Sequence, residues 1–316
     1  MPRRPNLFII GAMKSGTSSL HSYLQRHPDL FMSAWKEPAH YSYQDPSPRQ
    51  ERRYFRLFAG ARDERWVGES STAYSKRPRF GGVPDRLLEA APDARFVYLM
   101  RDPFGRIVSQ YKHHVRTGVE RVSVDRMARR RSGYLANSYY SFQLEPYYER
   151  FGRDAVFLGT AEALTDDPRS FLAGLFEWLG VDPTFVPPNV DRRFHQSPAL
   201  ARQVVGGPFS ERTLRRIGRS PLMGARALRL RRFLVRHVCT TRELDFGGDE
   251  FAEGVQQLRD RLGPMLAGWV TELVELTGRS YEEWRTVRDF GSPPTWTLPD
   301  EFWLPDEMRA RAASPS

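Results

Sequence analysis

A phosphate-binding loop is predicted at residues 11–19, which have the sequence GAMKSGTSS. The loop lies between an apolar run, Leu7–Ile10, and an apolar pattern of helical spacing that begins at Leu20. Glycines allow a tight turn, and the first amides of a helix present N–H donors and a positive dipole end to an anion. An ordinary strand-to-helix turn is the alternative, but it does not need lysine and hydroxyl residues in this order.

The order of residues in this loop differs from that of an ATP-binding Walker loop. That pattern has a glycine five residues before Gly-Lys-Ser/Thr, whereas Lys14 here precedes Ser15-Gly16-Thr17. A Walker-type kinase also needs a strand that ends in an aspartate to hold Mg²⁺. The strand predicted at residues 96–100 is followed first by Arg101 and only then by Asp102, so it does not end in an aspartate. An arginine there would repel a metal and attract an anion, so the sequence favours a nucleotide with two separate anionic groups and no metal.

The elements that would position these residues alternate between strands and helices. Strands are predicted at residues 7–10, 30–32, 66–68, 96–100 and 155–158, and helices at 104–114, 137–151 and 166–179. The unalternated run FVYLM at 96–100 is typical of a strand buried on both faces. The pattern predicts an α/β fold with a parallel sheet flanked by helices.

The pattern changes after residue 186. We expect an α/β core at 1–186, an Arg-rich variable segment at 187–248, a C-terminal helix packed on the core at 249–284, and a Pro/Trp-containing extended tail at 285–316. The helix predicted at 250–276 contains Pro264 and stops at Gly278. The C-terminal part is therefore expected to be mainly helical.

Charge and composition narrow the class of protein. The 316 residues contain 48 Lys plus Arg against 38 Asp plus Glu, a net charge of +10, and 40% are hydrophobic. A folded protein is expected. A single cysteine, no apolar run long enough to span a bilayer and no signal-peptide core favour a cytoplasmic location. A nucleic-acid-binding protein is an alternative that rests on charge alone, since no recognition helix, zinc finger or aromatic RNA-binding sheet is found, and no nucleic-acid partner is expected.

Most of the positive charge belongs to one segment, residues 211–236. It holds nine arginines and one acidic residue, interleaved with apolar residues. Three interpretations stay open: a lid over an anionic acceptor, a peripheral membrane contact for a lipid-linked acceptor, and a solvated surface.

Lysine is rare in this chain. Lys14, Lys36, Lys76 and Lys112 are the four lysines among 48 basic residues. A bias toward arginine codons explains the skew, and a lysine that remains under that bias hints at a place that needs a compact ammonium.

Three segments resemble those of sulfotransferases that use 3′-phosphoadenosine 5′-phosphosulfate (PAPS). Residues 10–20 resemble the 5′-phosphosulfate loop of that family, and residues 101–111, RDPFGRIVSQY, resemble its 3′-phosphate motif. Residues 35–38, WKEP, are similar to a segment of the carbohydrate branch, which includes heparan sulfate sulfotransferases and many bacterial enzymes. The resemblance implies a P-loop-like nucleotide-binding fold, PAPS as donor, adenosine 3′,5′-bisphosphate (PAP) as product and no metal.

The resemblance also implies a role for each matching residue. Lys14 would contact the oxygen between phosphorus and sulfur, and Arg101 and Ser109 would hold the 3′-phosphate. Glu37 would be the general base, with Lys36 holding the acceptor or the sulfuryl oxygens. The expected cofactor-binding residues are Lys14, Ser15, Gly16, Thr17, Ser18, Ser19, Arg101 and Ser109.

The acceptor is the least defined part of this interpretation. Residues 68–74, GESSTAY, resemble a segment that lines the acceptor cleft in the family. The candidate acceptor-side residues are His40, Glu69, Ser71, Tyr74, His113 and His114. His113 and His114 are also alternative bases, because cytosolic aryl and steroid sulfotransferases use a histidine. The expected partner is a small molecule or glycan with a hydroxyl group on a sugar, a lipid-linked group or a natural product.

Overall fold

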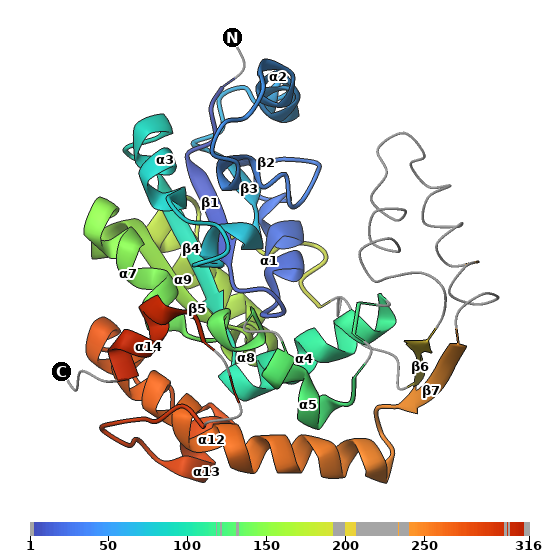
Figure 1. Ribbon diagram of the computed structural model, residues 1–316. Coiled ribbons are helices and arrows are strands. Elements are labelled where there is room, and N and C mark those ends of the chain that lie inside the picture. Colours follow the sequence, from blue (N-terminus) through green and yellow to red (C-terminus); the bar gives the residue numbers. More distant parts are fainter. Residues whose placement is uncertain are drawn as a thin grey trace.

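The computed structural model describes residues 3–117, 119–120, 122–130, 133–191, 200–206, 233, 240–299, 302 and 304–312. Its centre is a sheet of five parallel strands (Figure 1). In spatial order these are β2 (Leu30–Met32), β3 (Trp66–Ser70), β1 (Leu7–Gly11), β4 (Arg95–Met100) and β5 (Val156–Thr160). The parallel sheet flanked by helices that the sequence predicted is confirmed.

Helices cover both faces of this sheet. Leu7 and Ile9 of β1 pack into a cluster with α1 (Thr17–Leu24), α8 (Ala161–Asp166) and α9 (Pro168–Leu179). Phe8 and Ile10 point the other way, into a cluster with α3 (Val83–Ala90) and α7 (Tyr140–Phe151). The central strands are apolar on both faces because each face is covered.

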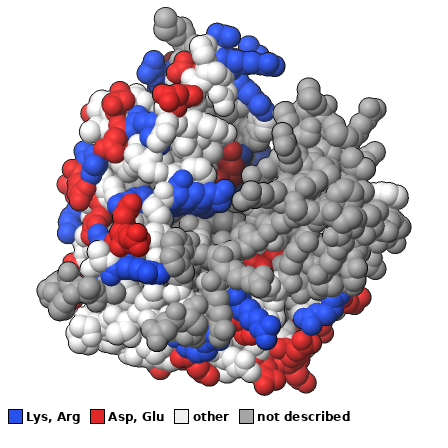
Figure 2. Space-filling view, viewed as in Figure 1, with Lys and Arg blue, Asp and Glu red and all other residues white. Residues whose placement is uncertain are grey.

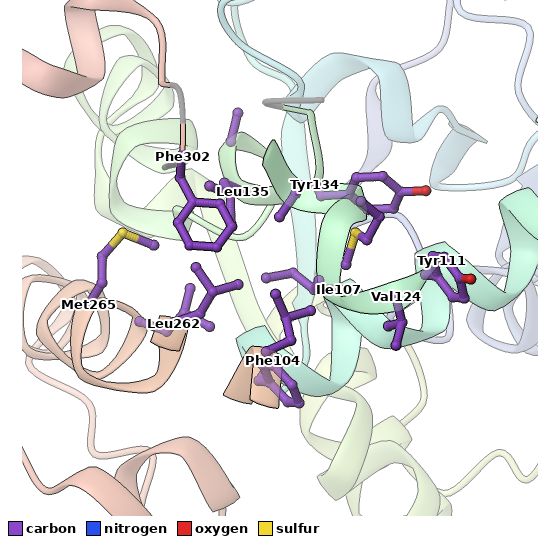
Figure 3. Packing of buried hydrophobic residues seen from close by; sticks show 14 of the residues in the cluster. Phe104, Ile107, Tyr111, Val124, Tyr134, Leu135, Leu262, Met265 and Phe302 are labelled. Atoms are coloured by element: carbon purple, nitrogen blue, oxygen red, sulfur yellow. The ribbon is translucent and has the colours of Figure 1, made fainter. Parts of the chain in front are cut away.

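A third apolar cluster forms a mainly helical lobe at the carboxyl edge of the sheet. Figure 3 shows Phe104 and Ile107 facing Leu262, with Met265 of the same cluster beyond Leu262. The cluster joins α4 (Pro103–Arg116), α5 (Val124–Arg130), α6 (Gly133–Ala136), α12 (Asp249–Thr277) and the antiparallel hairpin β6 (Leu200–Gly206) and β7 (Thr240–Asp245). The lobe fixes α4, which starts where β4 ends, against the rest of the molecule.

Several boundaries differ from the sequence prediction. The helix expected at 166–179 begins two residues later, at Pro168, because the side chain of Asp167 caps α9 there and Asp166 is the last residue of α8. The helix expected at 137–151 begins at Tyr140, and α12 continues through Pro264.

Other elements were not predicted. The hairpin β6–β7 was not expected, nor was α2 (Pro48–Phe55). The tail is not simply extended, since it contains α13 (Arg285–Phe290) and α14 (Asp306–Ala312) and buries Trp296 and Met308. Apart from Phe233, the Arg-rich segment 211–236 lies outside the described residues.

Candidate functional site

The loop after β1 has a backbone shaped for an anion. Lys14 and Gly16 both have positive φ, at 75° and 89°, and α1 begins directly after Gly16 with no acidic residue in its first turn. The amide of Ala12 donates to the carbonyl of Leu99 at 2.6 Å, which fixes the start of the loop to β4. A non-glycine residue at positive φ is strained, and such strain is common where a loop holds a ligand. The first amides of α1 are thus presented at the carboxyl edge of the sheet.

Side chains of the loop also fit an anionic group. The Ser15 hydroxyl is fully buried, and its Oγ has no hydrogen-bond partner in the described part of the chain. The pKa of Lys14 lies below its usual value, first because of burial and then because Arg116, Arg101 and Lys36 repel its charge. A buried unpaired hydroxyl and four mutually repelling cations are the features that a bound phosphate would satisfy.

Lys36 and Glu37 lie beside this loop. The Lys36 ammonium donates to Thr17 Oγ1 and to Glu37 Oε1, each at 3.1 Å. The Glu37 amide donates to the carbonyl of Ser70 at 2.8 Å, so the segment after β2 is fixed to the end of β3. The carboxylate is 42% exposed, and its Oε2 accepts from the amide and hydroxyl of Thr72 at 3.0 and 3.2 Å. One lysine therefore connects the loop to the predicted general base.

Arg101 leaves β4 at the same edge of the sheet. Its side chain forms no ion pair with an acid among the described residues. The next residue, Asp102, is buried and occupied, because its carboxylate accepts from the amides of Gly105 and Thr286, each at 2.7 Å. Ser109 is half-buried on α4 two turns beyond. The guanidinium is open to an anion, whereas the carboxylate that a kinase would need for Mg²⁺ caps α4.

The residues expected on the acceptor side fall into two groups. Glu69 is fully buried and accepts from the hydroxyls of Tyr54, Tyr74 and Ser71, the last at 2.6 Å. Burial raises the pKa of Glu69 to about 7, although the three hydroxyl donors oppose the shift. His40 stacks on Tyr54 with ring centroids 4.1 Å apart. These side chains form a buried polar network at the carboxyl end of β3.

The second group lies on α4. The Nδ1 atom of His114 is 2.7 Å from the hydroxyl of Tyr134, which donates to Glu120 at 2.9 Å. His113 precedes it in the last turns of the same helix, where its carbonyl accepts from Thr117. His114 belongs to a polar network of the helical lobe, separate from the residues that hold Glu37.

Two lysines near the site were not predicted as site residues. The Lys76 ammonium donates to Thr72 Oγ1 at 3.2 Å, and burial lowers its pKa to about 8. Lys112 lies over the rings of Phe246 and Phe251, and burial followed by repulsion from Arg101 lowers its pKa. Lys14, Lys36 and Lys76 thus lie around the loop and Glu37, and Lys112 lies on α4 within the electrostatic reach of Arg101. The rarity of lysine in the sequence was the feature that could have identified Lys76 and Lys112.

Arg116, at the end of α4, was also missed. It is exposed, and of the charged groups around Lys14 it has the largest effect on that residue's pKa. No ion pair of Arg116 with an acid is present within the described ranges. A cation in the last turn of a helix is ordinary, so position alone gave no reason to choose it.

Comparison with known proteins agrees with this geometry. A family model described as the sulfotransferase family matches residues 36–185. The crystal structure of a sulfotransferase from Alicyclobacillus acidocaldarius is similar over 90% of this chain and 99% of that one, with 26% identity and a TM-score of 0.57. Residues 36–185, slightly less than half of the chain, thus match the sulfotransferase family, and the likeness to a solved sulfotransferase supports this match. The family match includes Lys36, Glu37 and Arg101, and the structural match extends through most of the chain.

Two curated sulfotransferases are similar over shorter stretches. Membrane-associated sulfotransferase kil1 of Dictyostelium discoideum is 32% identical over 108 residues, which are 34% of this chain and 22% of the relative. Heparan sulfate glucosamine 3-O-sulfotransferase 3A1 of Mus musculus is 25% identical over 191 residues, 56% of this chain and 46% of the relative. The alignments span less than half the length of these relatives. Within the described residues, no helix has the length and apolar character needed to cross a membrane.

Proposed function

We propose that this protein transfers a sulfuryl group from PAPS to a hydroxyl group of an acceptor. The observation that supports this most directly is the ammonium of Lys36, which contacts both Thr17 of the phosphate loop and the carboxylate of Glu37. A group bound in the loop and a hydroxyl held by Glu37 would meet beside one cation. That is the arrangement which transfer between the two requires.

Each end of the donor has residues suited to it. The amides of residues 15–18, with the hydroxyls of Ser15, Thr17, Ser18 and Ser19, would hold the 5′-phosphate. Arg101 and Ser109 would hold the 3′-phosphate, the group that distinguishes PAPS from ATP. Lys14 would stabilise the negative charge that grows on the bridging oxygen as its bond to sulfur breaks.

Glu37 is the proposed general base. The acceptor oxygen forms a bond to sulfur, the bond between sulfur and the bridging phosphate oxygen breaks, and the acceptor proton passes to the carboxylate. PAP leaves with the electron pair of the broken bond. Glu37 Oε2 already accepts from the amide and the hydroxyl of Thr72, but among the described residues Oε1 accepts from Lys36 alone, so an acceptor hydroxyl could still donate to Oε1.

The acceptor class stays a proposal of broad scope. A hydroxyl on a sugar, a lipid-linked group or a natural product fits the site. One curated relative is named a heparan sulfate sulfotransferase, which is compatible with a glycan acceptor, and another is named a membrane-associated sulfotransferase. A cytoplasmic location and a membrane contact through residues 211–236 are likewise predictions, and that segment lies, apart from Phe233, outside the described residues.

The alternatives are less well supported. A kinase would need Asp102 to bind its metal, but that carboxylate caps α4 and accepts hydrogen bonds from two backbone amides. A nucleic-acid-binding protein would need a basic face. On the face in Figure 2, Lys and Arg side chains are interspersed with Asp and Glu among the described residues.

Calorimetric binding of PAP in EDTA, beside AMP and ATP, tests the donor assignment. We expect PAP to bind at least about tenfold more tightly than AMP, because Arg101 and Ser109 recognise the 3′-phosphate. An Arg101→Gln variant should lose most of that difference. Equal affinity for PAP and AMP, or ATP turnover that requires Mg²⁺, would overturn the proposal.

A further inference from the structure

Lys76 has no part in the transfer scheme above, yet a single residue, Thr72, connects its side chain to Glu37. It follows directly after the short 3₁₀ turn η3 (Thr72–Ser75), and its ammonium donates to Thr72 Oγ1 at 3.2 Å. The same hydroxyl donates to Glu37 Oε2 at 3.2 Å, beside the Thr72 amide at 3.0 Å. Lys76, Thr72 and Glu37 therefore form a continuous polar chain.

The position of η3 is fixed by the strand that ends in the phosphate loop. Ser75 Oγ donates to the carbonyl of Ile10 at 2.8 Å. Gly11 leaves room for this contact, because a Cβ atom there would overlap Ser75 Oγ and lie 3.0 Å from the ring of Tyr98. The lysine and the loop are thus held at a fixed spacing.

The direction of the hydrogen bonds in this chain follows from the chemistry of its groups. A charged ammonium has three donors and no acceptor, and a hydroxyl has a single proton to donate. While Lys76 is charged, the Thr72 hydroxyl must accept from it, and its proton is directed to Glu37. Glu37 needs such support, since its side chain is 42% exposed and its backbone has φ 61° on a loop.

We propose that Lys76 is a positioning residue for Glu37, acting by holding the Thr72 hydroxyl as a donor to the carboxylate. This inference rests on the proposed function, because it gives Lys76 a task only if Glu37 is the base. Lys36 holds one carboxylate oxygen and Thr72 the other, so the base is oriented from both sides.

The charged groups around Lys76 make the hydrogen-bonded chain of Lys76, Thr72 and Glu37 sensitive to pH. Burial is the main cause that lowers the Lys76 pKa to about 8, and Arg79, Arg106 and Lys36 lower it further, while Glu37 raises it. Above this pH the amine is neutral, so its hydrogen bond to Thr72 Oγ1 loses its charge assistance, and an orientation in which the Thr72 proton points to the amine nitrogen begins to compete with the one that points to Glu37. The rate should fall as the pH rises through about 8.

The pKa of each lysine can be measured separately, because the protein has four lysines. Spectra of protein labelled with ¹³C at the lysine side chains should show four Cε signals, and the signal missing in Lys76→Arg assigns Lys76. We expect that signal to titrate near pH 8. Titration at the usual lysine pKa of 10.5 would contradict the buried position on which the inference depends.

Hydrolysis of PAPS, with water in place of the acceptor, tests the action on Glu37. Lys76→Met and Thr72→Val should each lower kcat about tenfold with little change in PAP affinity. The double variant should be no slower than either single variant, because both act through one chain. Lys76→Arg and Thr72→Ser should retain most of the rate, and Lys76→Arg should lack the fall near pH 8, since a guanidinium stays charged.

The outcomes separate this inference from the proposed function. A wild type that neither binds PAP nor hydrolyses PAPS would overturn both. A wild type that does both, with multiplicative losses in the double variant or an unchanged fall near pH 8 in Lys76→Arg, would overturn only the assignment of Lys76.

Discussion

Replacing Lys76 by methionine should make the protein more stable while it slows the reaction. The pKa of Lys76 falls from 10.5 to about 8 on folding, chiefly because of burial. At about 1.4 kcal/mol per pH unit, the buried charge destabilises the folded state at neutral pH by about 3 kcal/mol. Loss of the hydrogen bond to Thr72 offsets about 1 kcal/mol, so we expect a net gain of about 2 kcal/mol in unfolding free energy.

The pH dependence gives this prediction its sign. Between about pH 8 and 10.5 the folded wild type binds fewer protons than the unfolded chain, so its stability rises with pH across this window. The methionine variant lacks that rise. Its advantage should therefore shrink by about 2 kcal/mol between pH 7 and about pH 9.5, and other titrating groups cancel in the difference.

Urea unfolding of both proteins at the two pH values measures this quantity. Lys36→Met is the matched control, because Lys36 is paired with Glu37 nearer the surface and its removal should bring no such gain. A Lys76→Met variant that is less stable than wild type at neutral pH, or a difference that does not change with pH, would refute the reasoning.

Three further predictions follow from the site. Lys14→Met should lower the rate of sulfuryl transfer at least about 100-fold in single-turnover assays, while calorimetry should find its PAP affinity within about tenfold of wild type. Equal losses in rate and affinity would contradict a role in the transition state. Glu69 keeps its proton in the folded state up to pH about 7, against 4.5 when unfolded, so wild-type stability should fall as the pH rises across that window. Urea unfolding of Glu69→Gln should lack this fall, and an unchanged slope would assign it to another group. Gly11→Ala should weaken PAP binding at least about tenfold by displacing Ser75, whereas Gly81→Ala, with no atom near the added methyl, should bind PAP normally. Equal PAP affinities of the two variants would contradict the role of Gly11.

The sheet and the phosphate loop could be predicted because their physical requirements leave local traces in the sequence. Strand β4 is buried on both faces, so residues 96–100 are all apolar, and the loop needs glycine at position 16 for its positive φ. Arg101 directly follows a predicted strand, and Lys14 and Lys36 each come four residues after one, which placed all three at one edge of the sheet.

The rest depends on which strands are neighbours. Lys76 and Glu37 are 39 positions apart in the sequence, and they meet because β2 and β3 are adjacent and parallel. The carboxyl of Glu69 was expected near the acceptor, but it faces inward to two tyrosines that come from other elements. No local sequence pattern predicts such contacts. The rarity of lysine was the single indirect indication in the sequence that the remaining lysines belong to the site.

Transfer from radiolabelled PAPS tests the central claim most directly. Purified protein would be incubated in EDTA with labelled PAPS and a panel of sugar, lipid-linked and small-molecule hydroxyl acceptors, and labelled products identified by mass spectrometry. We predict a sulfated product together with PAP for at least one acceptor, and loss of that product with Glu37→Gln. Full activity of Glu37→Gln would contradict the assigned base, and phosphorylated products from ATP in place of sulfated ones would contradict the claim itself.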